Sequence, residues 1–80
     1  MRAISNHYIL LKMNTIKTKS RDEFYLTDEE HGFLACNYGG EPVDLMDINI
    51  LATHANDLRV AAIALSVVQK MEEQGVDRLV

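Results

Sequence analysis

The chain has 80 residues, of which 48% are hydrophobic and 25% are charged, and its formal net charge is −4. This composition excludes a wholly disordered chain, and no segment approaches the roughly 18 apolar residues that span a membrane. A chain of this length forms one domain, so we expect a single unit over residues 1–80 with residues 1–6 frayed. The lone cysteine excludes an intrachain disulfide and is typical of a cytoplasmic protein.

Charge is unevenly distributed along the chain. Residues 1–21 contain five basic and no acidic side chains, whereas residues 22–80 contain three basic and twelve acidic ones. One interpretation is a nucleic-acid-binding transcriptional regulator that uses the basic N-terminal segment, through Lys12, Lys17, Lys19 and Arg21. Nucleic-acid-binding domains are usually basic overall, and this one is acidic, so direct nucleic-acid binding is not favoured.

The first expected element is a hairpin. Residues 8–18 partly alternate between apolar and polar side chains, and residues 23–27 contain Phe24 and Tyr25, which favour strands. A polar turn separates the two segments, so we predict a hairpin of residues 8–18 with 23–27. A helix that begins near Ser5 is the competing prediction. Met13 is an alternative natural start, which would make the first twelve residues an upstream extension.

A capping box predicts the next helix. Thr27 is a suitable N-cap, and Glu30, three residues later, can complete a capping box. We therefore predict a helix from Asp28 to about residue 37, ended by Gly39-Gly40. Its inward side chains are expected to be Phe33, Leu34 and Asn37, with His31 or Tyr38 at the margin.

Residues 43–54 fit either a strand or a helix by periodicity. We predict a short strand at Val43–Leu45, a turn at Asp47 and a short helix from Ile48 to His54.

The last element is a long helix from residue 57 to residue 74, with Asn56-Asp57 as N-cap and Gly75 and Val76 as C-terminal cap. Its apolar arc covers roughly 200°, about twice what a helix on one small core needs. We expect one flank to face the core, through Val60, Ile63, Ala64, Val67 and Met71. The other flank is the predicted homodimer interface, formed by Leu58, Ala61, Leu65 and Val68.

No pattern for metal or cofactor binding is present. The possible metal ligands, His7, His31, Cys36 and His54, lack the paired spacing of metal sites. A small cysteine-dependent enzyme that uses Cys36 with His31 or His54 is an alternative interpretation. We expect Cys36 instead to be a buried small hydrophobe, and the protein to be neither an enzyme nor a cofactor carrier.

The strand–Leu26-Thr27-x-Glu29-Glu30–helix–Gly–strand pattern over residues 14–50 resembles short accessory proteins of phages and prophages. The resemblance implies a small genetic-element protein, and such proteins often bind and block a host factor such as a CRISPR defence complex. It carries no site residue over to this chain.

These observations together predict an α+β fold, with a small antiparallel sheet packed against the long C-terminal helix; the alternative is a mainly α, small helical bundle. We expect a non-enzymatic, oligomeric binding protein that regulates or inhibits a macromolecular partner with a basic surface, either a protein or a protein–nucleic-acid complex. Its contact surface is predicted to be acidic, since charge complementarity steers association. The residues of this surface would be Asp28, Glu29, Glu30, Glu41, Asp44 and Asp47.

Overall fold

The computed structural model describes residues 17–80. The predictions for residues 1–16, including the first strand of the hairpin, the helix near Ser5 and the alternative start at Met13, lie outside the described residues. The elements in chain order are β1 (Thr18–Lys19), α2 (Asp28–Tyr38), β2 (Val43–Asp44), α3 (Leu45–His54), α4 (Leu58–Gln74) and β3 (Arg78–Leu79).

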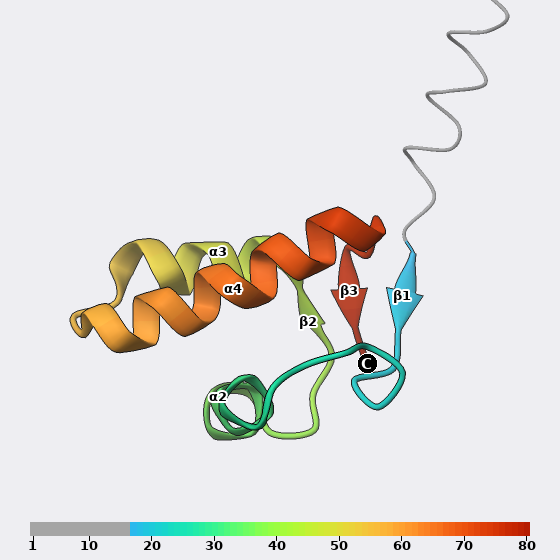
Figure 1. The fold of residues 1–80 in the computed structure, drawn as a ribbon, viewed down its shortest axis with the longest axis horizontal. Coiled ribbons are helices and arrows are strands. Elements are labelled where there is room, and N and C mark those ends of the chain that lie inside the picture. Colours follow the sequence, from blue (N-terminus) through green and yellow to red (C-terminus); the bar gives the residue numbers. More distant parts are fainter. Residues whose placement is uncertain (1–16) are drawn as a thin grey trace, which may run out of the picture.

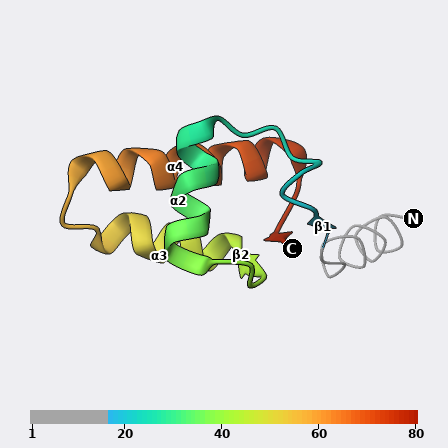
Figure 2. The same cartoon turned by 90° about the horizontal axis from the view of Figure 1, so that it is seen from below.

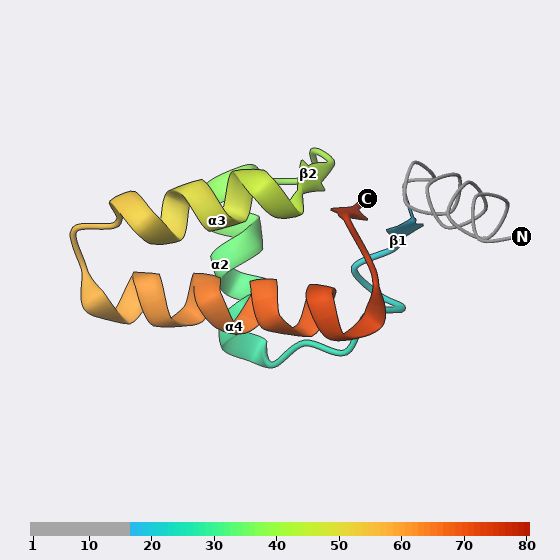
Figure 3. The same ribbon diagram turned by 90° about the horizontal axis from the view of Figure 1, so that it is seen from above.

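Three helices dominate the arrangement. α3 and α4 lie side by side as an antiparallel pair, and α2 crosses one face of that pair (Figures 2 and 3). The short strands lie together near the C-terminal end of α4 (Figure 1). The fold therefore contains both α and β elements, as predicted. However, α4 packs principally against α3 and α2.

The sheet differs from the predicted hairpin. Its strand order is β1-β3-β2, with β1 parallel to β3 and β2 antiparallel to it. Residues 23–27 form no strand, because the chain turns back at Ser20, whose carbonyl accepts from the amides of Glu23 and Phe24. Phe24 and Leu26 are nevertheless buried. The strand-favouring residues of this segment thus fill the core without joining the sheet.

The core lies where the helices and the sheet meet. Its buried members come from every described element except β1, and from the loops before α2 and after α4. The predicted core flank of α4 is confirmed, because Ala64, Val67 and Met71 are buried and Val60 and Ile63 pack partly buried against the core. The largest fully buried side chains are Phe24, Leu34, Ile48, Met71, Leu79, Val43 and Val67.

The prediction for α2 is confirmed at both ends. The Thr27 hydroxyl accepts from the Glu30 amide, the Glu30 carboxylate accepts from the Thr27 amide, and the helix ends at Gly39. The predicted inward position of Asn37 is wrong. Asn37 is exposed and its Nδ2 donates to the Phe33 carbonyl at 2.8 Å, so its amide finds a partner on its own helix.

The boundaries of α3 and α4 follow from their caps. α3 begins directly after β2, so the predicted turn at Asp47 is wrong. Asp57 caps α4 by accepting from the Arg59 amide. At the other end Gly75 has φ 68°, and the Val76 amide donates to the Met71 carbonyl at 2.8 Å. This left-handed Schellman cap was predicted, and it turns the chain from α4 toward β3.

Candidate interaction surfaces

The α3–α4 pair exposes most of the large apolar side chains that residues 17–80 leave in solvent. Four of these six side chains lie on it, namely Met46, Ile50, Leu58 and Leu65. On the helical wheel of α3, Met46 and Ile50 lie about 160° from the buried Ile48. α2 and the sheet cover only one face of the pair (Figures 1 and 3). The helical pair therefore carries exposed apolar side chains that residues 17–80 do not cover.

Three of the four predicted interface residues have exposed surface. Leu58 is 88% exposed and Leu65 is 46% exposed, while Ala61 is half-buried. The prediction is wrong for Val68, which is only 5% exposed and belongs to the core. On the helical wheel Val68 lies about 40° from Ala64, within the arc that faces the other helices.

A buried carboxylate joins α2 to α4. Glu30 is 3% exposed, and its two oxygens accept from the Lys70 ammonium at 2.5 Å and from the Ser66 hydroxyl at 2.5 Å. The Lys70 ammonium also lies 5.1 Å from the centre of the Tyr25 ring, a cation–π arrangement. Glu30 was predicted to lie on the acidic contact surface, and that prediction is wrong. Its capping role turns its side chain inward, toward α4.

The environment of Glu30 keeps it ionised. Burial alone would raise its pKa, but hydrogen bonds from Lys70, Ser66 and the Thr27 amide outweigh burial, and the pKa of Glu30 is lowered. Ser66 and Lys70, four residues apart on α4, have the residue types of a serine–lysine catalytic pair. Both donate to Glu30, however, and these bonds join α4 to α2. Sequence reasoning missed this cluster, because no pattern within α2 or α4 places Glu30 against Ser66 and Lys70.

The remaining acidic residues of the predicted contact surface are exposed. They are Asp28, Glu29, Glu41, Asp44 and Asp47. Residues 17–80 together contain six basic and twelve acidic side chains, which gives this part of the chain a formal charge of −6. This part of the chain therefore repels an acidic partner overall and attracts a basic one.

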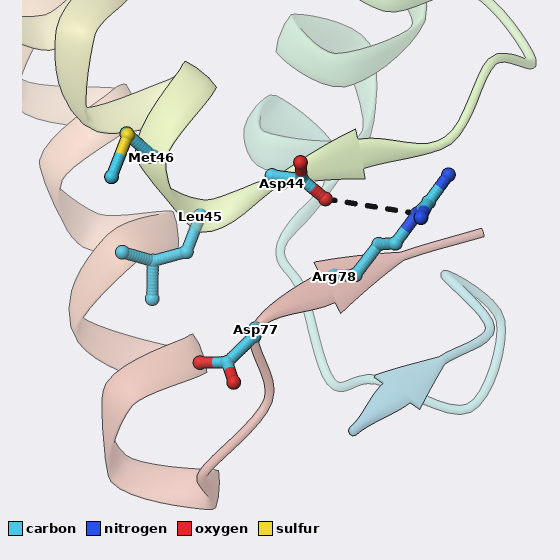
Figure 4. Close-up of a pocket in the computed structure, with 5 residues that line it drawn as sticks. All are labelled: Asp44, Leu45, Met46, Asp77 and Arg78. Carbon is cyan, nitrogen blue, oxygen red and sulfur yellow. Dashed lines mark ion pairs between the residues drawn. The ribbon is translucent and has the colours of Figure 1, made fainter. Parts of the chain in front are cut away.

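A small groove lies where β2 runs into α3, opposite the start of β3 (Figure 4). It has a volume of about 260 Å³, and its lining residues are Asp44, Leu45, Met46, Asp77 and Arg78. Arg78 Nε lies 3.6 Å from Asp44 Oδ1, and both side chains are partly exposed. The groove is smaller than the roughly 300–1,000 Å³ of typical ligand pockets, so we assign no ligand to it.

Two of the basic residues considered for nucleic-acid binding are engaged within the chain. The Arg21 guanidinium donates to the Gly39 and Glu41 carbonyls, which fastens the loop between α2 and β2. Lys19 Nζ donates to Gln74 Oε1 at 3.0 Å. Lys17 is exposed and Lys12 lies outside the described residues. Lys19 therefore links β1 to the end of α4, and Arg21 links the loop after β1 to the loop between α2 and β2.

The cysteine does not have the predicted surroundings. Cys36 is exposed on α2, so the prediction of a buried thiol is wrong. His31 and His54 are exposed as well, and His54 Nδ1 lies 3.0 Å from the Ile50 carbonyl of its own helix. Within residues 17–80 no three His, Cys, Asp or Glu side chains converge as metal ligands would. None of the helices in this part of the chain is long and apolar enough to cross a bilayer.

Comparisons with protein-family models, with curated proteins and with solved structures find no match for this chain.

Proposed function

We propose that this chain is a small non-enzymatic binding protein that self-associates through α4 and regulates or inhibits a macromolecular partner with a basic surface. The observation that supports this function best is the exposure of four large apolar side chains on the α3–α4 pair. Large apolar side chains left exposed on a small domain are typical of protein-contact sites when they lie together. A dimer would shelter Leu58 and Leu65 from water, and the exposed acidic residues would remain accessible to the partner.

The acidic residues support the second half of the proposal. Asp28, Glu29, Glu41, Asp44 and Asp47 are exposed, and of these only Asp44 takes part in an ion pair among the described residues. A surface of one sign accelerates association with a partner of opposite sign. A phage or mobile-element protein that blocks a host factor, such as a defence complex, would use such a surface.

The two alternative functions have less support. Lys19 and Arg21 make hydrogen bonds within the chain, which weakens the case for a basic nucleic-acid-binding segment. A gel shift at low and moderate salt tests that alternative, because phosphate contacts give a steep salt dependence. A cysteine-dependent enzyme needs a base within hydrogen-bond reach of the thiol, and Cys36 makes no hydrogen bond among the described residues.

Size-exclusion chromatography with light scattering tests self-association. We expect the wild-type chain to be dimeric at high concentration and the Leu58→Ser/Leu65→Ser variant to be monomeric. Val80→Ser is the matched control, because Val80 is 51% exposed but lies outside α4, and it should remain dimeric. A wild-type chain that is monomeric at every concentration would remove this part of the proposal.

Affinity capture from the source cell tests the acidic contact surface. A partner held by Asp44 and Asp47 should be lost from an Asp44→Asn/Asp47→Asn variant and should elute as salt rises. Glu72→Gln/Glu73→Gln is the control with the same change in charge. Equal loss with both variants would mean that net charge alone, and no particular surface, governs capture.

A further inference from the structure

Ser66 on α4 lies between two acceptors but has only one proton to donate. Its Oγ lies 2.5 Å from Glu30 Oε2 and 2.7 Å from the carbonyl oxygen of Ile63, one turn earlier on its own helix. A hydroxyl carries a single donor hydrogen together with lone pairs that accept. While Glu30 is ionised, Ser66 can therefore donate to the carboxylate or to the carbonyl, but not to both at once.

The charge on Glu30 decides which acceptor receives that proton. A hydrogen bond to an ionised acceptor is about twice as strong as a neutral one, so Ser66 donates to the ionised carboxylate. The Ile63 carbonyl then faces the lone pairs of Oγ across 2.7 Å and receives no hydrogen bond from Ser66. The ionised state thus leaves one close contact of the cluster without a proton.

A proton added to Glu30 supplies the missing donor. A protonated carboxyl group has one O–H donor and keeps acceptor capacity on its other oxygen. With the proton on Oε2, Glu30 donates to Ser66 Oγ, and Ser66 in turn donates to the Ile63 carbonyl. Glu30 Oε1 continues to accept from the Thr27 amide at 2.8 Å. The hydrogen bond between α2 and α4 reverses its direction, and no atom has to move far.

We propose that Ser66 is a reversible hydrogen-bond partner that keeps α2 attached to α4 whether Glu30 is ionised or protonated, so that acid releases Lys70 alone. Protonation removes the counter-charge of the Lys70 ammonium. The side chain of Lys70 is 26% exposed, so its ammonium can move into water. The cation–π contact with Tyr25 would be lost with it.

The other ionisable side chains near Glu30 do not compete for this role. Of the charged side chains in residues 17–80, Lys70 alone forms an ion pair or a hydrogen bond with the Glu30 carboxylate. The neighbouring titratable residues of α2, namely Asp28, Glu29 and His31, are exposed. The response to acid at this contact therefore belongs to Glu30 and Lys70.

Nuclear magnetic resonance of the full chain tests the proposal. The ¹³C shift of the Glu30 carboxyl group marks the pH at which it titrates. Hydrogen exchange, corrected for the intrinsic rate at each pH, then compares the amides of α2 with those of α4 above and below that pH. In the wild-type chain we expect the protection of α2 relative to α4 to change by less than about threefold. The Lys70 ammonium resonance should shift toward that of a solvated lysine.

Two variants separate the hydroxyl from the packing around it. Ser66→Ala leaves a protonated Glu30 without its acceptor on α4, so the relative protection of α2 should fall by about tenfold as Glu30 is protonated. Ser66→Thr keeps the hydroxyl and should behave as wild type. Equal behaviour of Ser66→Ala and wild type would overturn the inference. So would a wild-type chain that loses the protection of α2 as Glu30 titrates, a result that needs no variant to fold.

Discussion

The carboxylate of Glu30 on α2 lies 2.5 Å from the ammonium of Lys70 on α4, although forty residues separate them in the chain. Glu30 at the same time completes the capping box of its own helix. One side chain therefore begins a helix and attaches that helix to its neighbour.

This double role predicts a large cost for removing Glu30. We expect Glu30→Ala to lower the free energy of unfolding by about 2–4 kcal/mol, since it loses a cap and leaves Lys70 without its buried partner. Glu29→Ala, an exposed acid in the same turn, should cost less than about 1 kcal/mol. Urea unfolding measures both. A similar small loss for the two variants would mean that the Glu30–Lys70 pair contributes nothing net.

The lowered pKa of Glu30 predicts acid sensitivity. Because its pKa in the folded state is below the unfolded value of about 4.3, the unfolded chain binds more protons as the pH falls through this range. The stabilisation from Glu30 is present above the unfolded pKa and is lost as the pH falls through the folded pKa. Urea unfolding from roughly pH 7 to pH 3 should show a shallower loss of stability for Glu30→Gln than for wild type. If the stability of Glu30→Gln and of wild type fell equally with pH, the lowered pKa of Glu30 would be contradicted.

Two apolar residues of α4 should respond differently to truncation. Met71 is fully buried, so Met71→Ala should cost about 2–5 kcal/mol through lost transfer energy and the cavity left behind. Leu58 is exposed in the single chain, so Leu58→Ala should change monomer stability by less than about 0.5 kcal/mol. Thermal unfolding at low protein concentration compares them. A large loss for Leu58→Ala under those conditions would show that Leu58 packs within its own chain.

The exposure of Cys36 predicts fast but ordinary thiol chemistry. A thiol reagent should label the native chain to completion without denaturant, because the side chain is exposed on α2. The rate at neutral pH should match that of a free cysteine peptide, because Cys36 makes no hydrogen bond to a base among the described residues. A rate well above the peptide, abolished by His31→Ala or His54→Ala, would revive the enzyme alternative.

Elements with local signals were predictable from the sequence. The capping box at Thr27 and the glycine cap at Gly75 fixed the start of α2 and the end of α4, since these signals act over a few residues. The pairing of β1 with β3 was not predictable, because it joins segments sixty residues apart through strands of only two residues. A strand of two residues is too short to show the alternation of apolar and polar side chains by which strands are predicted.

The candidate site was predictable in part for a similar reason. Periodicity placed Leu58 and Leu65 on one stripe of α4, but it could not separate Val68, which lies at the border between the stripe and the core. The buried state of Glu30 required knowing that α2 crosses α4. No pattern within either helix predicts that crossing. Glu30 was therefore predicted to be exposed, whereas in the structure it is buried and accepts from Ser66 and Lys70.

The central position of β3 in the sheet has a consequence for biosynthesis. Both neighbouring strands hydrogen-bond to β3, and Leu79 is fully buried. A nascent chain that has left the ribosome only as far as α4 can form its helices but has no strand on which β1 and β2 can assemble. The sheet is therefore expected to close after translation of this region has finished, and nonsense mutations just before Arg78 should leave helices that cannot complete their packing.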